Sequence, residues 1–140
     1  MQIDNHETIC LIYSPDLTTL NYPDDLLIRT AFNNELSMHL KPYIERNEKI
    51  YSLTSHGLLI LLEHSNEMRL ASFYRIVNSY FFIWNYRQIH FQCGISYTKG
   101  KIDAIAASDL FFILSEKIPT SIKNNHPESV KLDDIMYRFM

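Results

Sequence analysis

The segment Ile50-Tyr-Ser-Leu-Thr-Ser-His-Gly-Leu-Leu-Ile-Leu-Leu62 contains two apolar runs on either side of a short polar turn. Gly57 lies in that turn and can adopt a positive φ without a steric penalty. This pattern predicts an antiparallel hairpin of residues 50–53 and 58–62. Because the second run is apolar at every position, we expect it to be a central strand with both faces buried.

Two further strands are predicted outside this hairpin. Residues 9–13, Ile-Cys-Leu-Ile-Tyr, form a compact apolar run that stops at the turn signal Ser14-Pro15-Asp16. Residues 89–97 have the composition of a strand and end before Thr98-Lys-Gly100. The sheet is therefore expected to contain four strands.

Three segments carry apolar residues at helical spacing. Residues 24–43 begin with acidic side chains, where the helix dipole favours them, and residues 66–86 follow Ser65, which can cap a first turn. Residues 103–117 form a third amphipathic segment that Pro119 ends. The apolar stripe of the first segment consists of Ile28, Phe32, Leu36 and Leu40.

The resulting order is β-α-β-β-α-β-α, which predicts a ferredoxin-like α+β domain with an antiparallel sheet and helices packed on one face. We assign residues 1–118 to this domain. Residues 119–129 are polar and interrupted by proline, so we expect a linker. The apolar spacing of residues 130–140 predicts a short C-terminal amphipathic helix. Since this fold hosts many unrelated functions, it does not by itself indicate one.

Composition excludes several classes of protein. The 140 residues are 46% hydrophobic and 21% charged, which suits one soluble domain with a real core. A formal net charge of -3 offers little attraction to nucleic acid or anionic lipid, so we expect neither as a partner. The N-terminus does not resemble a secretory signal, and no apolar run approaches the roughly 18 residues of a membrane span. Cys10 and Cys93 lie in apolar runs typical of reduced, buried thiols, which favours a cytoplasmic location.

Over about residues 9–118, the arrangement resembles the GGDEF domain of diguanylate cyclases, which join two GTP molecules into cyclic di-GMP. Residues 52–62 correspond to that family's R-x-G-G-D-E-F-A-I-L-L, and Gln92-Cys-Gly-Ile-Ser96 resembles the strand S-I-G-I-A. Residues 108–116 resemble the helix A-D-x-A-L-Y-x-A-K, with Gly94 and Asp109 as literal matches. The resemblance implies a GGDEF or nucleotidyl-cyclase-like fold.

The metal-binding positions of the family are altered in this chain. The two aspartates of the family's first strand correspond to Tyr13 and Pro15. Proline has no side-chain oxygen, and a neutral phenol is a poor ligand for Mg²⁺, which needs carboxylates. Thr54-Ser-His-Gly57 replaces G-G-D-E, so both glycines and both acids of the signature are missing.

The nucleotide contacts are altered as well. Asn21 is retained, but Thr30 stands where the family has Asp and Glu116 where it has a phosphate-holding Lys. The inhibitory product site R-x-x-D corresponds to Glu45 and Glu48, so its Arg is missing. Because each lost contact to a metal or transition state typically costs several kcal/mol, the resemblance implies a degenerate domain that is not an enzyme and needs no metal or cofactor.

Other chemistries find little support in the sequence. His56 and His64 lack the third and fourth donors of a zinc site, and Ser14, Ser55 and Cys93 lack a nucleophile motif. The strands at residues 11–14 and 58–63 also resemble a BLUF flavin photoreceptor. That family needs a Gln where Ile60 stands and has a shorter first helix. We therefore expect no catalytic residue.

These observations favour a non-catalytic regulatory domain of bacterial cyclic di-GMP signalling that acts by binding a protein. Degenerate GGDEF domains dock onto an EAL phosphodiesterase, a cyclase or another effector, so the resemblance implies such a partner or a homodimer. Exposed aromatics concentrate at interfaces, and two of them lie off the buried stripe of the second predicted helix. The candidate interface residues are Phe82, Tyr86, Leu132, Ile135, Met136 and Phe139.

An alternative function also follows from the resemblance. The chain could be a sensor that binds GTP or cyclic di-GMP near Asn21 without turnover and signals by a change of shape. Asn21 is the one vestigial nucleotide-binding residue that we assign. Calorimetry with both nucleotides distinguishes this sensor from a domain that acts by protein contact alone.

Overall fold

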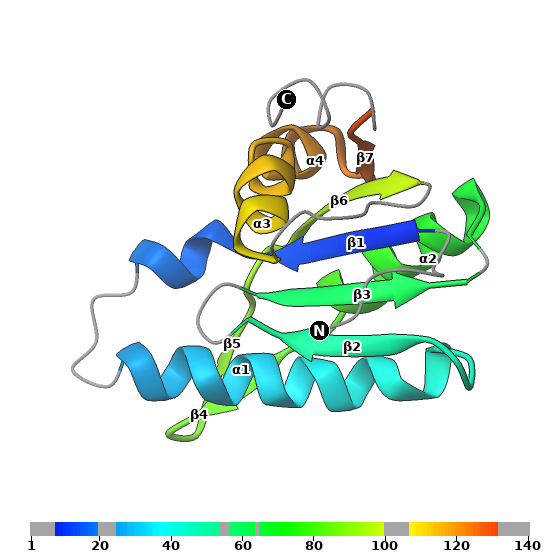
Figure 1. Cartoon of the computed structure of the whole chain (residues 1–140). Coiled ribbons are helices and arrows are strands. Elements are labelled where there is room, and N and C mark those ends of the chain that lie inside the picture. The colour runs from blue at the N-terminus through cyan, green and yellow to red at the C-terminus, as the bar shows by residue number, and fades with distance from the viewer. Residues whose placement is uncertain (1–7, 20–24, 54–56, 64, 100–106, 132–140) are drawn as a thin grey trace.

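The computed structural model describes residues 8–19, 25–53, 57–63, 65–99 and 107–131 (Figure 1). The elements in chain order are β1 (Thr8–Tyr13), η1 (Pro15–Thr19), α1 (Asp25–Leu40), η2 (Lys41–Tyr43), β2 (Lys49–Ser52), β3 (Leu58–Leu62), α2 (Glu67–Asn78), β4 (Phe82–Trp84), β5 (Arg87–Ile89), β6 (Gly94–Lys99), α3 (Ala107–Ser115), α4 (Ile118–Asn124) and β7 (Glu128–Ser129). This is the α+β class expected from the sequence.

The main sheet has the strand order β2-β3-β1-β6-β7. The pairs β2–β3, β3–β1 and β1–β6 are antiparallel, and β7 is parallel to β6. In this register Cys10 lies between Ile60 and Tyr97. Every residue of β3 is buried, which confirms that the second strand of the hairpin is central.

Helices cover both faces of this sheet, whereas we expected them on one face. Cys10, Ile12 and Ile60 pack with buried residues of α1 and α2. Their neighbours Ile9 and Leu11 pack with residues of α3 and α4 on the opposite face (Figure 1). Successive side chains of a strand point to opposite faces, so strands that are apolar at every position require cover on both.

The first helix follows the predicted stripe. Ile28, Phe32, Leu36 and Leu40 are all buried. The helix gives way to the 3₁₀ turn η2 at Lys41, next to Pro42, which has no N–H to donate to a helical bond. The predicted end at residue 43 therefore includes this turn.

The second helix is shorter than the predicted span of residues 66–86. Asn66 caps α2 by accepting a hydrogen bond from the Arg69 amide at 2.8 Å, while Ser65, the expected cap, is hydrogen-bonded to Thr8. At the other end, Asn78 exchanges two hydrogen bonds with the backbone of Cys93 at 2.8 and 3.0 Å. These bonds to residues 15 positions away tie the end of α2 to the segment before β6.

The aromatic residues after α2 form a separate hairpin, β4–β5, instead of two more helical turns. The turn is made by Asn85 and Tyr86, whose φ angles of 51° and 64° are those of the left-handed region. The predicted fourth strand, residues 89–97, is accordingly divided, because Ile89 ends β5 and the main-sheet strand β6 begins at Gly94.

Residues 119–129, which we expected to be a linker, instead form most of α4 and all of β7. Gly94 permits the close packing of α4 on β6, since a Cβ there would lie 2.7 Å from the carbonyl oxygen of Ile118. The buried Ser121 Oγ accepts a hydrogen bond from the Ile95 amide at 2.9 Å and donates to the His126 carbonyl at 2.7 Å. This segment therefore packs against the sheet.

Some predictions fall outside the described residues. Of the third predicted helix, the structure describes α3 from Ala107 onward. Of the predicted C-terminal helix, it describes residues 130 and 131. Within the described ranges, no helix combines the length and apolar character needed to cross a bilayer.

Candidate functional site

The end of β1 and the β2–β3 turn lie together, as a site between them requires. Gly57 has a φ of +95°, and a Cβ at this position would lie 2.2 Å from the carbonyl oxygen of Ile12. The Leu53 amide donates to the Gly57 carbonyl at 2.9 Å and closes the turn. Gly57 thus has the positive φ that the sequence pattern allowed. Residues 54–56, which include His56, lie outside the described residues, as does His64.

The two positions matching the family's aspartates lie at this end of the sheet. Tyr13 is half-buried, and its ring meets that of Phe111 in α3 edge-on, with centroids 5.7 Å apart. Pro15 begins η1. Asp16, the next residue, accepts a hydrogen bond from the Gln92 amide at 3.1 Å. The Asp16 carboxylate therefore holds the segment before β6 in place.

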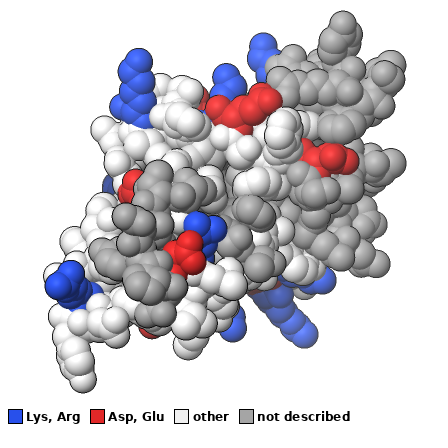
Figure 2. Space-filling model, turned by 90° about the vertical axis from the view of Figure 1, so that its left-hand side faces the viewer, with Lys and Arg blue, Asp and Glu red and all other residues white. Residues whose placement is uncertain are grey.

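Charges are mixed over this end of the molecule. Figure 2 shows Lys and Arg interspersed with Asp and Glu on this face instead of a patch of one sign. Across the described ranges, the structure brings together no group of three or more His, Cys, Asp or Glu side chains that could hold a metal ion. A Mg²⁺ site built from several carboxylates is thus not found in the described part of the chain.

Of the remaining nucleotide positions, the structure describes Thr30 and Glu116. Thr30 is exposed on α1, and its hydroxyl donates to the Leu26 carbonyl at 3.0 Å. Glu116 is exposed just after α3. Asn21 lies outside the described residues. The vestigial nucleotide site assigned from the sequence therefore stays a prediction.

Glu48, at the position of the family's inhibitory product site, belongs to a buried ion pair. Its carboxylate accepts hydrogen bonds from the amides of Glu45 at 2.7 Å and Glu63 at 2.9 Å. Both terminal nitrogens of Arg69 also donate to it, one of them at 2.6 Å. Arg69 in addition donates to the Tyr43 carbonyl at 3.3 Å. The pair thus joins α2 to the connection before β2 and to the end of β3.

The environment of this pair favours its charged form. Burial of Glu48 opposes ionisation, but the hydrogen bonds from Arg69 and the two backbone amides outweigh it and hold the pKa of Glu48 below its ordinary value. The same contact with Glu48 raises the pKa of Arg69. The sequence identifies Glu48 only as a remnant of the family's product site. Its pairing with Arg69 could not be predicted, because the two residues are 21 positions apart in the chain.

The candidate interface residues of the aromatic segment separate into buried and exposed ones. Phe82 is 1% exposed and contacts Phe32 and Phe91 at centroid distances of 5.8 and 6.0 Å. Its prediction as a surface residue is wrong, because strand alternation turns it inward where a helix would have turned it outward. Tyr86, at the tip of β4–β5, is fully exposed. Leu132, Ile135, Met136 and Phe139 lie outside the described residues.

Sequence reasoning missed two further exposed residues of this segment. Phe81 is 50% exposed, and its ring is tilted against that of His90 with a centroid distance of 5.2 Å. Ile83 is 65% exposed. The inward and outward alternation of residues 81–84 could have indicated a strand, but the same run also fits helical spacing. We call Phe81, Ile83 and Tyr86 the hairpin surface.

The two cysteines behave as the sequence predicted. Cys10 and Cys93 are unbridged and buried. Burial raises the pKa of both thiols to about 12. Both thiols are therefore protonated near neutral pH, and neither is suited to act as a nucleophile.

Comparison with known proteins places this geometry in context. No family model matches the sequence. The chain is 24% identical over 130 residues to the cyclic di-GMP phosphodiesterase PdeF of Escherichia coli strain K12. The match covers 92% of this chain and 17% of that protein, so the chain spans less than a fifth of its length.

Solved structures show the fold more directly. An EAL/GGDEF domain protein from M. capsulatus matches with a TM-score of 0.66 at 10% identity, covering 89% of this chain and 84% of that one. The GGDEF domain of FimX from Pseudomonas aeruginosa matches with a TM-score of 0.58 at 13% identity, covering 91% and 81%. The diguanylate cyclase SiaD of the same species, solved with its activator SiaC, matches with a TM-score of 0.61 at 9% identity, covering 91% and 50%. The chain therefore has the GGDEF-domain fold, as the sequence resemblance implied.

Proposed function

We propose that this chain is a regulatory GGDEF-like domain of cyclic di-GMP signalling that makes no cyclic di-GMP and acts by binding a protein partner. The fold and the similarity to a cyclic di-GMP phosphodiesterase support the signalling system. The proposed lack of cyclase activity rests on one observation: Tyr13 and Pro15 stand where the family has its two metal-binding aspartates.

The loss of these two aspartates matters because the cyclase reaction depends on bound metal ions. Phosphoryl transfer between nucleotides needs divalent cations that neutralise the phosphates, and Mg²⁺ is held by carboxylate oxygens. Tyr13 packs edge-on against Phe111, and Pro15 has no side-chain oxygen. Asp16, the acid nearest in sequence, bonds to the Gln92 amide. Among the described residues at this end of the sheet, no group of carboxylates replaces the acids with which the family binds Mg²⁺.

A protein partner is supported by the hairpin surface. Phe82 and Trp84 stack on the inner side of β4, while Phe81, Ile83 and Tyr86 are exposed. Tyr86 holds a left-handed φ of 64°, a conformation that costs a side-chain-bearing residue about 1–2 kcal/mol. Large aromatic side chains are enriched at the centres of protein interfaces. An EAL phosphodiesterase or a cyclase is the class of partner that we propose.

The first experiment measures cyclase activity. GTP is incubated with the chain in Mg²⁺ or Mn²⁺, with an active GGDEF cyclase as a positive control, and cyclic di-GMP is quantified by chromatography. We expect no product. Product formation above the protein-free blank would contradict the non-catalytic part of the proposal.

The second experiment measures binding to purified EAL and GGDEF proteins by size-exclusion chromatography and calorimetry. Tyr86→Ala should weaken the complex by about tenfold or more, as interface aromatics do. Phe112→Ala is the matched control, since Phe112 is an exposed aromatic residue of α3. If Phe112→Ala weakens the complex and Tyr86→Ala does not, the hairpin surface is not the interface. If the chain stays monomeric in the presence of each EAL and GGDEF protein, the proposal is wrong.

The same calorimeter tests the sensor alternative. The chain is titrated with GTP and with cyclic di-GMP. We expect no binding tighter than about 50 μM, roughly −6 kcal/mol. Tighter binding of either nucleotide would favour the sensor over the protein-contact function.

A further inference from the structure

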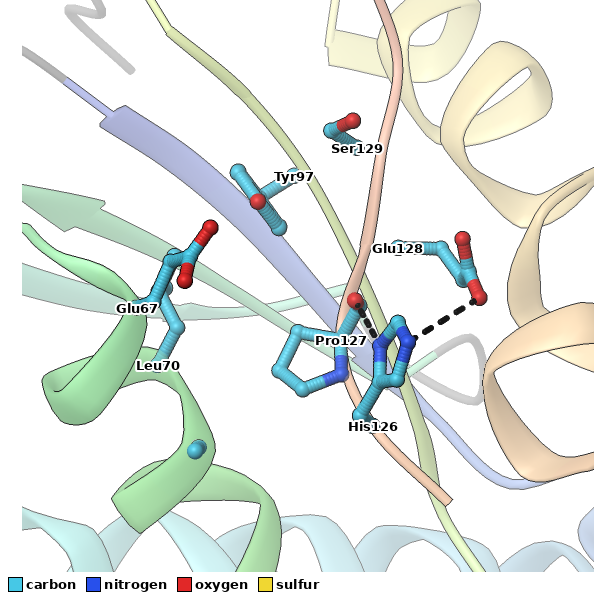
Figure 3. Close-up of a pocket in the computed structure, with 8 residues that line it drawn as sticks. Glu67, Leu70, Tyr97, His126, Pro127, Glu128 and Ser129 are labelled. Carbon is cyan, nitrogen blue, oxygen red and sulfur yellow. Dashed lines mark hydrogen bonds and ion pairs between the residues drawn. The ribbon is translucent and has the colours of Figure 1, made fainter. Parts of the chain in front are cut away.

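A hollow lies away from the end of β1, between α2 and the edge formed by β6 and β7. It has a volume of about 420 Å³, within the range of small-molecule sites. Figure 3 shows Glu67 and Leu70 of α2 on one side, Tyr97 of β6 behind, and the chain from His126 to Ser129 on the other side. The sequence assigned no role to these residues.

Hydrogen bonds hold both walls of this hollow in place. Asn66 caps the first turn of α2, which carries Glu67. On the far side, the His126 amide donates to the Ser121 carbonyl at 3.2 Å, and the Val130 amide donates to the Tyr97 carbonyl at 2.8 Å. The site is therefore formed before any ligand arrives, which lowers the cost of binding.

The charge of the hollow is negative on the α2 side. The Glu67 carboxylate makes no hydrogen bond or ion pair with another described residue, and it lies on the Tyr97 side of the pocket (Figure 3). Among the described residues that line it, none is Lys or Arg; Lys99, two positions further along β6, is outside this lining. Burial raises the pKa of Tyr97, and the negative charge of Glu67 raises it further, so the phenol is neutral near pH 7.

The opposite wall has its own internal partners. The Asn124 amide donates to Glu128 Oε1 at 3.0 Å, and His126 Nε2 lies 3.9 Å from the same oxygen. His126 Nδ1 contacts the Pro127 carbonyl at 2.5 Å (Figure 3). The Glu128 carboxylate thus already has partners within this wall, whereas that of Glu67 has none among the described residues.

The remaining lining supplies apolar contact. Leu70, Ala71 and Pro127 line the pocket with carbon surface beside Glu67, and the aromatic residue Tyr97 lines it with them. A carboxylate, an aromatic ring and apolar walls together suit a cation on an aliphatic stem. We propose that this pocket binds a guanidinium or ammonium group carried on a short aliphatic chain, with Glu67 as its counter-charge. This inference is independent of the proposed function.

The test uses butylguanidinium and butylammonium as probes, with the neutral isostere butylurea as the matched control. Binding is followed by amide chemical shifts of the full chain in ¹H–¹⁵N NMR. We expect saturable shifts at Leu70, Ala71, Tyr97 and Ser129, with dissociation constants of about 1 mM, from either cation. Shifts of equal size with butylurea, or no saturable shift up to about 20 mM of either cation, would overturn the proposal.

Two variants distinguish this pocket from general charge attraction. Glu67→Gln should weaken butylguanidinium binding about fivefold to tenfold, as loss of a charge-assisted hydrogen bond does. Asp109→Asn removes the same charge from an exposed position on α3, on the other face of the sheet, and should leave binding unchanged. Equal affinity in wild type and Glu67→Gln would overturn the proposal. Glu67 is exposed, and circular dichroism checks that the variant is folded.

A final arm separates the two sources of such a cation. The blocked peptide acetyl-Gly-Arg-Gly-amide is titrated beside butylguanidinium. Binding of the peptide at equal or higher affinity supports a basic side chain of a partner protein as the ligand. Binding of butylguanidinium alone supports a small free cation in the same pocket.

Discussion

Glu48 and Arg69 illustrate how single residues tie this fold together. The Glu48 carboxylate receives hydrogen bonds from two backbone amides and a bidentate contact from Arg69. Arg69 also lies over the Phe73 ring, 5.3 Å from its centroid. A buried ion pair is stable when all its hydrogen bonds are made, as they are here. Removal of one partner leaves the other as an uncompensated buried charge.

Glu48→Gln should therefore lower the free energy of unfolding by about 2–4 kcal/mol at pH 7, as measured by urea denaturation. The double variant Glu48→Leu with Arg69→Met leaves no uncompensated charge. Its loss of unfolding free energy should therefore be smaller than the sum of the losses in Glu48→Leu and Arg69→Met alone. Additive losses would show that the two residues stabilise the fold separately.

The same pair predicts a dependence of stability on pH. The pKa of Glu48 is lower in the folded chain than its ordinary value of 4.5. A carboxyl of this kind stabilises the fold at pH values above the unfolded pKa, and that contribution is lost as the pH falls through the lower folded pKa. Wild type should lose stability more steeply than Glu48→Gln below about pH 4.5. Parallel curves for the two proteins would contradict this.

At the scale of elements, the β4–β5 hairpin combines an unfavourable turn with exposed aromatic residues. Asn85 and Tyr86 both have positive φ, a turn in which Asn-Gly is the preferred pair. A Tyr at this position, where glycine would make the better turn, is consistent with a role for its side chain.

Tyr86→Gly should therefore stabilise the chain by about 0.5–1 kcal/mol while weakening the complex with its partner. Thermal unfolding measures the first effect and calorimetry with the partner the second. Tyr86→Ala, which keeps the Cβ, is the control that should show only weaker binding. A loss of stability on Tyr86→Gly would mean that the ring contributes more to the fold than the strained φ costs.

The α4–β7 element makes a separate prediction through Ser121. Its buried hydroxyl bonds to both the Ile95 amide and the His126 carbonyl. Ser121→Ala leaves both groups unpaired and should cost about 1–3 kcal/mol in the free energy of unfolding. Ser79→Ala, which removes an exposed hydroxyl bonded to its own helix at 2.9 Å, should cost less. An equal and small loss in both variants would indicate that residues 119–129 contribute little to the folded domain.

At the scale of the whole molecule, burial is concentrated in two adjacent strands. β1 and β3 lie in the interior of the sheet and face α1 and α2 on one side and α3 and α4 on the other. β7 has two residues at the sheet edge, and β4–β5 forms its own two-stranded sheet. Stability is therefore expected to differ between the centre and the periphery.

Hydrogen exchange measured by NMR should reveal this gradient. Amides of β1 and β3 should exchange slowest, by global unfolding, and those of β5 and β7 should exchange through local opening. The mutation Ser121→Ala should speed exchange in β7 and α4 more than in β3. Uniform protection across the described strands would contradict the gradient.

The strands at the centre and the stripe of α1 could be predicted because their periodicity is local. The end of α2 could not, since the run at residues 81–84 fits both helical and strand spacing and the bonds of Asn78 to Cys93 join distant segments. The helix α4 was missed for a similar reason. It is short, begins beside Pro119, and packs on the space left by Gly94.

The amino-acid order alone determined that two strands would be buried on both faces and that Tyr13 and Pro15 would replace the family's acids, because apolar runs and residue identities need no folding to be seen. Only the tertiary structure decided that Phe82 is buried while Tyr86 is exposed, that Arg69 pairs with Glu48, and that Glu67 and Tyr97 line one hollow. These contacts join residues far apart in the chain, so they depend on how the helices pack against the sheet.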